Sequence, residues 1–400
     1  MPPFVAYVLA EERALVRVCG VSLLDRMLRQ LQRLTCSSAT VLSSCIEHVG
    51  TDWARRELPV ILRRREAGPL RARELHLLNL AEALVLSADY YCDSRLLAAL
   101  TKATESALIV DSAPPSEWLS LLRSAARNQH GWVCPCARVT ASSLGKVDPE
   151  TEVFAVATRF VDVATLPCYV TNMRREIRPL WFPAPATAEQ VRLAERRILD
   201  AAQNGTLDLP AMVHAPTETW IIARLCKTSI TPNQITFLTA AVSLLVTVLF
   251  ATAHLWSGTI LALIVGVLDG LDGKQARVKV ETTKLGKREH IVDYVLELSW
   301  WTALACRFGA YGPLVLLVVS DLFDRFAKRV AKERTGRNLD DVAPFDRFVR
   351  LIGGRRNIYV WIFAGSLLAG IPDQGFFAVC VWGALTAAVH VLRALWIARW

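Results

Sequence analysis

The sequence predicts two domains of different classes: an N-terminal layered, Rossmann-like α/β domain and a C-terminal all-α bundle of six transmembrane helices. At 400 residues the chain is long for a single domain. Its 53% hydrophobic residues are distributed unevenly, because the long apolar runs lie after residue 234. The first half instead alternates short apolar stretches with amphipathic ones. We therefore expect the α/β domain at 1–180, a helical linker at 181–233 and the bundle at 234–400.

Strand and helix patterns alternate through the first 180 residues. The expected strands are Phe4–Ala10, Ala39–Leu42, Leu84–Asp89, Ala107–Asp111 and Val153–Ala157. The expected helices are Leu23–Leu34, Leu77–Leu84 and Ser94–Thr104. This alternation predicts a layered domain with a mostly parallel sheet.

Two stretches of this domain resemble the nucleotidyltransferases that activate sugar and inositol phosphates. They are GVSLLDRMLRQL from Gly20 and LVLSADYYCDSRLL from Leu84. The resemblance implies that Asp89 holds a catalytic metal. Such enzymes cradle a triphosphate in a glycine-rich loop after the first strand, whereas this loop has no glycine before Gly20. Because Glu11 and Glu12 would also repel an anion, we interpret the domain as inactive.

The linker contains two helical patterns and ends at a helix start. Residues Ala186–Ala202 form the first pattern, and Pro216–Cys226 form the second. The second is amphipathic and is expected to lie at the membrane interface. At Thr231 a capping residue precedes Pro232, which suits the first turn of a helix.

Six apolar segments follow and are interpreted as membrane spans. They are Ile235–Leu255, Ser257–Ala276, Ile291–Cys306, Tyr311–Leu322, Ile358–Ile371 and Phe376–Ile397. Several are short for a span, so flanking residues are expected to extend them.

Basic residues gather in two of the loops between these segments. The loop after the second segment is basic, and the loop after the fourth holds ten Lys or Arg from Arg325 to Arg356. By the positive-inside rule both loops are cytoplasmic. We therefore expect a multi-pass protein of the inner (cytoplasmic) membrane, with its N-terminal domain facing the cytoplasm. The net charge of +9 lies beside apolar segments, which indicates membrane lipids and no nucleic acid as partner.

Four carboxylates frame the first basic loop. Asp269 and Asp272 are three residues apart, and Glu289 and Asp293 are four apart. Each spacing places a pair on one face of a helix. Two such helices can bring four carboxylates together, which is the oxygen cage that Mg²⁺ prefers. Because charges at a membrane edge are costly, we expect a functional site there.

The same stretch resembles the signature of the CDP-alcohol phosphotransferase (phosphatidyltransferase) family, D-x2-D-G-x2-A-R-x8-G-x3-D-x3-D. The matching residues are Asp269, Asp272, Gly273, Ala276, Arg277 and Gly286. Counted strictly, the last two aspartates fall on His290 and Tyr294. A loop one residue shorter places them on Glu289 and Asp293. We favour that alignment because a tyrosine would not replace a catalytic aspartate, and either Glu289 or His290 takes the third acidic position.

The resemblance implies a membrane transferase of phospholipid or inositol-phosphodiester synthesis. In this family a CDP-linked donor binds through Mg²⁺ or Mn²⁺, and an alcohol acceptor displaces CMP. The implied metal ligands are Asp269, Asp272, Glu289 and Asp293, of which Asp272 and Asp293 are also the catalytic residues. The implied nucleotide-binding residues are Gly273, Ala276, Arg277 and Gly286. The family also implies a homodimer. The order of domains is similar to bifunctional inositol-phosphate cytidylyltransferase/phosphotransferase proteins.

Two other functions stay open. Glu289 and the missing glycine loop would suit a non-catalytic membrane scaffold in which both sites have decayed. Acidic residues in membrane helices also mark ion-coupled transporters. Among ten cysteines the only close pair is Cys134-Pro-Cys136. That pair has no partner motif, so the sequence favours reduced thiols over a zinc site.

Overall fold

The computed structural model describes residues 4–45, 47, 57–77, 82–205, 207–281 and 289–399. The chain divides into two compact units. The first comprises Met1–Cys168 and Ile177–Ala201, and the second comprises Tyr169–Glu176 and Ala202–Trp400. Each unit is built around its own core.

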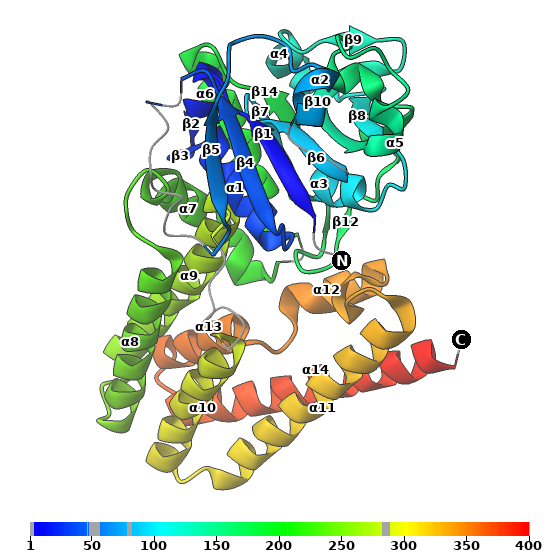
Figure 1. Ribbon diagram of the computed structural model, residues 1–400. Helices are drawn as coiled ribbons and strands as arrows, with labels where there is room; N and C mark the ends of the chain where they lie inside the picture. Colours follow the sequence, from blue (N-terminus) through cyan, green and yellow to red (C-terminus); the bar gives the residue numbers. More distant parts are fainter. Residues whose placement is uncertain are drawn as a thin grey trace. The chain divides into compact units, whose positions relative to one another are not determined.

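An eight-stranded mixed sheet organises the N-terminal unit (Figure 1). Its strand order is β11-β8-β10-β6-β1-β4-β5, with β9 paired to β10. The strands are β1 (Val5–Leu9), β4 (Ser38–Ser43), β5 (Val60–Arg64), β6 (Glu82–Ser87), β8 (Ala107–Asp111), β9 (Arg127–Asn128), β10 (Gly131–Thr140) and β11 (Arg159–Asp162). Four neighbouring strands, β6, β1, β4 and β5, are parallel, whereas β10 is antiparallel to both β6 and β8. The predicted α/β class is therefore confirmed.

Short strands and helices complete this unit. The ribbons are β2 (Arg17–Val18) with β3 (Val21–Ser22), and β7 (Tyr90–Cys92) with β14 (Trp181–Pro183). The helices are α1 (Leu23–Arg33), α2 (Ala72–Leu77), α3 (Ser94–Thr101), α4 (Leu119–Leu122), α5 (Ala141–Leu144) and α6 (Ala188–Ala201). Helix α1 begins where Ser22 accepts a hydrogen bond from the Asp25 amide, a regular N-cap.

Two predicted elements of the first domain are wrong. Of the helix expected at Leu77–Leu84, residues 78–81 lie outside the described residues; α2 ends at Leu77, and residues 82–84 belong to the strand β6. The strand expected at Val153–Ala157 is a 3₁₀ helix at Val153–Val156, and β11 follows it. A short apolar run has no reliable period, so helix and strand are poorly separated by pattern alone.

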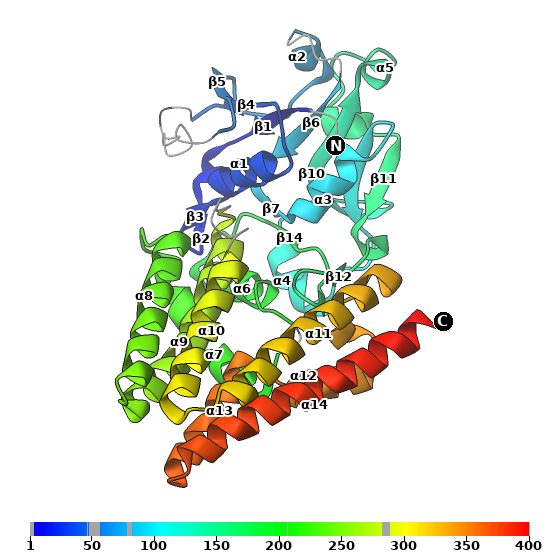
Figure 2. The same cartoon turned by 90° about the horizontal axis from the view of Figure 1, so that it is seen from below.

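Long helices form the C-terminal unit (Figure 2). They are α7 (Leu209–Leu225), α8 (Pro232–Ala251), α9 (Leu255–Lys279), α10 (Glu289–Phe308), α11 (Tyr311–Thr335), α12 (Pro344–Ile352), α13 (Arg356–Leu368) and α14 (Pro372–Ala398). The ribbon β12 (Tyr169–Val170) with β13 (Arg175–Glu176) also belongs to this unit. All six helices expected after residue 234 are present.

Three of the helices are long and apolar enough to cross a membrane: α8, α9 and α14. This holds for the described residues only, and the expected count of six spans is not confirmed. The helices also carry large exposed apolar side chains, which on α8 include Phe237, Leu238 and Leu244. Exposed apolar faces of this size are typical of surfaces that contact lipid or protein.

The bundle core is built mainly from aromatic and branched residues of α8, α9, α10, α11, α13 and α14. Trp300 of α10 is completely buried, and its indole N–H donates to the Ser243 carbonyl of α8 over 2.8 Å. Around it lie Phe250, Val265, Phe363 and Phe376. The tryptophan pair at 300–301 therefore packs the bundle and does not form a membrane belt.

Helices α8 and α9 are joined at both ends. At one end, three residues separate them. At the other end, α8 begins with a capping box formed by Thr231, the expected cap, and Gln234. The last turns of α9 are hydrogen-bonded to the segment that precedes α8. The Gln275 side chain donates to the Ile230 carbonyl over 2.5 Å, and Lys279 donates to the carbonyls of Thr228 and Ile230 over 2.8 and 2.9 Å. We call these contacts the α8–α9 clamp.

Helix α7 begins earlier than the sequence pattern indicated. It starts at Leu209 with Asp208 as its N-cap and carries Pro216 in its interior, where a helix start was expected. The other linker helix, α6, belongs to the N-terminal unit.

Candidate functional site

The two aspartates of α9 lie where the sequence placed them, on one side of the helix. Asp272 is almost completely buried and both of its oxygens are bonded. Thr236 of α8 donates to Oδ2 over 2.7 Å, and the Gly273 amide donates to Oδ1 over 2.5 Å. Because these bonds come from two helices, they fix the direction in which the carboxylate points.

Asp269 is paired with an arginine that the sequence analysis did not select. The Arg356 guanidinium, at the start of α13, lies 2.6 Å from Asp269 Oδ2. The arginine side chain is mostly buried, whereas the Asp269 side chain is 36% exposed, so water reaches the aspartate side of the pair. Arg356 was counted only among the basic loop residues, since nothing in the local pattern separates it from its neighbours.

Asp293 of α10 joins the same group. Its carboxyl interacts electrostatically with those of Asp269 and Asp272 and with the Arg356 guanidinium. Three of the four predicted carboxylates are thus brought together from two helices. Gly286 and the side chains of Glu289 and His290 lie outside the described residues.

A further carboxylate, Glu297, lies four residues after Asp293, one helical turn along α10. It interacts with Arg356 and accepts a hydrogen bond from the Trp301 indole over 3.4 Å. The i,i+4 series that runs from Glu289 through Asp293 reaches Glu297, so the same periodicity would have found it.

The remaining signature residues lie along α9. The Arg277 side chain lies against Gly273, where a Cβ would be 3.3 Å from its Nη1. Its Nε donates to the Ala202 carbonyl over 2.8 Å. Ala276 lies on the same side of the helix as Asp269 and Asp272. Gly273 leaves room for the Arg277 side chain, and the small Ala276 adds little bulk beside the two aspartates.

A buried glutamate of α7 lies against α9. Glu218 is 7% exposed. A Cβ on Gly270 would be 2.7 Å from its Oε1, so a larger residue at 270 would require the Glu218 carboxylate to shift. Glu218 interacts with Lys274, which in turn donates to Thr219 over 2.6 Å. The sequence analysis missed Glu218 because it lies far from the signature in sequence.

We expect Gly270→Ala to displace the Glu218 carboxylate from α9. The added methyl group would collide with the end of this side chain, which would turn aside and lose its present position beside Lys274. We expect a fall in activity smaller than the roughly hundredfold that a misplaced site can cost. CMP release and thermal unfolding in detergent would be compared with Gly312→Ala, where a Cβ meets nothing within 4 Å. Equal activity of the two variants would contradict this role of Gly270.

The ionisation of Glu218 gives a pH dependence. Burial raises the pKa of its carboxyl from 4.5 to about 7; Lys274 and Arg277 oppose the shift, and Asp269 and Asp208 add to it. Between these values the folded protein keeps a proton that the unfolded chain has released. The stability that this proton contributes is complete below pH 4.5 and is lost as the pH rises through about 7.

Glu218→Gln stays neutral at every pH and tests this prediction. The variant should match the wild type near pH 5 and exceed its melting temperature at pH 8, by roughly 2–4 °C. Thermal unfolding at both pH values measures the difference. A difference that is the same at pH 5 and pH 8 would show that Glu218 does not titrate in this range.

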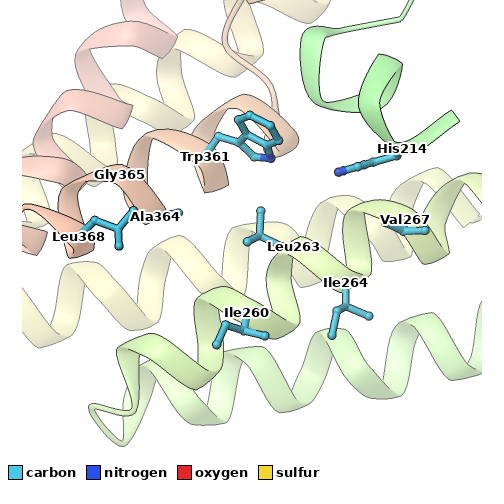
Figure 3. A pocket seen from close by; sticks show the side chains of 9 residues that line it. All are labelled: His214, Ile260, Leu263, Ile264, Val267, Trp361, Ala364, Gly365 and Leu368. Carbon is cyan, nitrogen blue, oxygen red and sulfur yellow. The ribbon is translucent and has the colours of Figure 1, made fainter. Parts of the chain in front are cut away.

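An open apolar pocket of about 550 Å³ lies elsewhere on α9 (Figure 3). Its lining on this helix is the stripe Ile260, Leu263, Ile264 and Val267, and Trp361 of α13 and His214 of α7 line it from other sides. By helical periodicity the stripe is on nearly the opposite side of α9 from Asp269 and Asp272. The pocket is therefore separate from the carboxylate group.

In the N-terminal unit, Asp89 lies at the end of β6 beside another acid. The Glu11 amide donates to Asp89 Oδ1 over 3.3 Å. Burial raises the pKa of the Asp89 carboxyl, and the nearby Glu11 carboxylate adds to the shift. After β1 the chain forms a 3₁₀ helix at Glu12–Leu15. The described residues at this edge thus present the carboxylates of Glu11 and Asp89.

Comparison with known families identifies the helical unit. The sequence model of the family described as CDP-alcohol phosphatidyltransferase matches residues 229–327. The chain contains a CDP-alcohol phosphatidyltransferase domain. The matched residues of this phosphatidyltransferase domain include Asp269, Asp272 and Asp293, whereas Glu218 and Arg356 lie outside them.

Solved structures similar to this chain are of two kinds. The inositol-1-phosphate CTP transferase from T. maritima has 11% identity and a TM-score of 0.35, and covers 49% of this chain and 96% of its own. HddC from Yersinia pseudotuberculosis has 9% identity and a TM-score of 0.35, and covers 48% and 99%. The Mycobacterium tuberculosis phosphatidylinositol phosphate synthase with CDP-DAG bound has 18% identity and a TM-score of 0.34, and covers 46% and 94%. A search of curated proteins gives no match.

The phosphatidyltransferase domain and the three long apolar helices together indicate a membrane protein with CDP-alcohol phosphotransferase activity. Which donor and which acceptor it uses is a matter for proposal.

Proposed function

We propose that this protein transfers a phosphatidyl or other phospho-alcohol group from a CDP-linked donor to an alcohol acceptor and releases CMP. The observation that carries the proposal is that Asp269, Asp272 and Asp293, in the part of the chain that matches the family, interact with one another and with Arg356. A scaffold would have no need of carboxylates that repel one another.

The carboxylates fit a hard divalent cation. All three donors are oxygens, the ligand type that Mg²⁺ and Mn²⁺ select. Asp269, Asp272 and Asp293 would hold the cation, with Glu289 as the proposed fourth ligand. When bound, the cation neutralises charge on the transferring and leaving phosphates.

The protein's own residues would perform the remaining tasks. Asp293 would accept the proton of the acceptor hydroxyl while the hydroxyl oxygen forms a bond to the β-phosphorus of the donor. The bond from that phosphorus to the bridging oxygen then breaks, and CMP leaves. Gly273, Ala276 and Gly286 would leave room for the nucleotide, and Arg277 would lie beside its phosphates.

For the donor we propose the lipid CDP-diacylglycerol. The family's description as a phosphatidyltransferase and the exposed apolar surfaces of the helices support a lipid. A soluble donor of the CDP-inositol type is the second candidate, favoured by the likeness of the first residues to enzymes that activate inositol phosphates. We propose an inositol-phosphate-type acceptor on the same ground, and a homodimer whose site faces the cytoplasm.

CMP release by detergent-solubilised protein tests the function. Each donor would be offered with Mg²⁺ or Mn²⁺ and with inositol, inositol phosphate or glycerol phosphate. Release that requires the cation and one acceptor supports the transferase and names its substrates. If folded protein releases no CMP from any pair, the scaffold is the better proposal. Transport without CMP release would favour an ion-coupled transporter.

The N-terminal unit is proposed to be inactive. The Glu11 carboxylate after β1 would repel a nucleoside triphosphate, and the loop that follows β1 has no glycine before Gly20 to cradle it. We therefore expect no pyrophosphate release from CTP and inositol phosphate with Mg²⁺ present, measured on the full chain. Pyrophosphate release that is lost in Asp89→Asn would contradict this expectation.

A further inference from the structure

Three cysteines meet inside the N-terminal unit, although the sequence shows only the pair Cys134 and Cys136. The third is Cys92. The three Sγ atoms all lie within 4.8 Å of one another. Exposed fractions are 2% for Cys92 and 0% for the other two. The sulfurs therefore share one enclosed volume in the core.

Two different sheets supply these sulfurs. Cys134 and Cys136 belong to β10, whose register against β8 shifts between Cys134 and Ala137. A proline between them suits such an irregularity, because it has no amide hydrogen to offer the ladder. Cys92 ends β7, which pairs with β14 and places Trp181 opposite Cys92. A sulfur from the small ribbon thus joins two from the central sheet.

The polar groups beside the cluster are already bonded to one another. The neighbouring Asp111 carboxylate already accepts from Arg178 over 2.5 Å and from Trp181 over 3.0 Å. The three sulfurs are therefore the atoms of this cluster that can act as ligands to a cation.

We propose that Cys92, Cys134 and Cys136 bind a thiophilic d¹⁰ cation, either Zn²⁺ or Cu⁺. Thiolates select these cations over hard ones. With metal–sulfur bonds of about 2.3 Å, ligand sulfurs lie about 4 Å apart, which the cluster accommodates with small side-chain movements. Binding would release the thiol protons to solvent. Three sulfurs suit Cu⁺, while structural Zn²⁺ usually takes four ligands.

The bound cation would tie the β7 ribbon to the central sheet. Tyr90, the first residue of β7, directly follows Asp89. The cation would therefore also hold the chain just after the acidic end of β6. Because a ligand that binds only the folded state stabilises it, the melting temperature of the N-terminal unit should rise with the cation concentration.

The test uses the full chain, reduced and freed of metal in detergent. Zn²⁺ is titrated against a chromogenic chelator, and Cu⁺ is titrated anaerobically against bicinchoninate. One equivalent of one cation should bind, and Cys134→Ser should weaken binding by about a hundredfold or more. Cys36→Ser is the matched control, because Cys36 is buried but lies outside the cluster. It should bind as the wild type does.

Wild-type protein gives an independent readout should Cys134→Ser fail to fold. X-ray absorption of the bound cation should show a shell of about three sulfurs near 2.3 Å. A shell of oxygen and nitrogen, binding of neither cation, or equal weakening by Cys36→Ser would each overturn the proposal. None of these readouts depends on transferase activity.

Discussion

Asp272→Asn should abolish CMP release while leaving the protein folded. The substitution keeps the size of the side chain and an oxygen that accepts from Thr236, so the contact between α8 and α9 survives. It removes the negative charge that a divalent cation requires. We expect a loss of roughly a thousandfold in kcat, at the upper end of what single electrostatic groups contribute in active sites.

Asp373→Asn is the matched control for this loss. Asp373 is an exposed acid in the first turn of α14, away from the signature. It should retain wild-type activity and the same dependence on Mg²⁺. If Asp272→Asn stays within tenfold of the wild type while both variants unfold alike, the assignment of Asp272 to the metal would be wrong.

Arg356→Ala should destabilise the protein, and it should do so more than Arg329→Ala. The guanidinium is the partner of Asp269 and also interacts with Asp293 and Glu297. Removing Arg356 leaves Asp269 without its partner. Because the Asp269 side chain is 36% exposed, water screens part of the cost, which we expect to be about 1–2 kcal/mol. Thermal or chemical unfolding in detergent measures this loss, and Arg356→Lys should recover part of it.

A double variant separates charge from packing. Arg356→Met combined with Asp269→Asn should be more stable than Arg356→Met alone, because no unpaired carboxylate remains at position 269. It should still fail to release CMP. Arg329→Ala, in which the arginine side chain is 79% exposed beside Glu333, is the control and should change stability little. Equal stability of Arg356→Ala and Arg329→Ala would contradict the role of the pair.

Features set by local sequence were predictable. The start of α8 followed from Thr231 and Pro232, and the shared side of Asp269 and Asp272 followed from helical periodicity. Both depend on residues within one or two turns. The α/β class followed in the same way from alternating apolar runs, even though the strand expected at Val153–Ala157 is helical.

Features set by distant contacts were not predictable. Arg356 reaches Asp269 from another helix, and Glu218 reaches Gly270 from a helix that precedes the signature. Both residues are too far from Asp269 in the sequence for a helix or strand period to connect them with it. The third cysteine was missed for the same reason, since β7 and β10 belong to different sheets that come together only in the folded unit.

The α8–α9 clamp restricts how a substrate can enter. With a three-residue turn at one end and side-chain bonds to Thr228 and Ile230 at the other, the two helices are expected to move as one rigid body. Sliding of one past the other would break the side-chain bonds of the clamp. Asp272 of α9 is bonded to Thr236 of α8, whereas Asp293 and Arg356 belong to α10 and α13. We therefore expect opening and closing of the carboxylate group to come from α10 and α13 moving against a stationary α8–α9 pair.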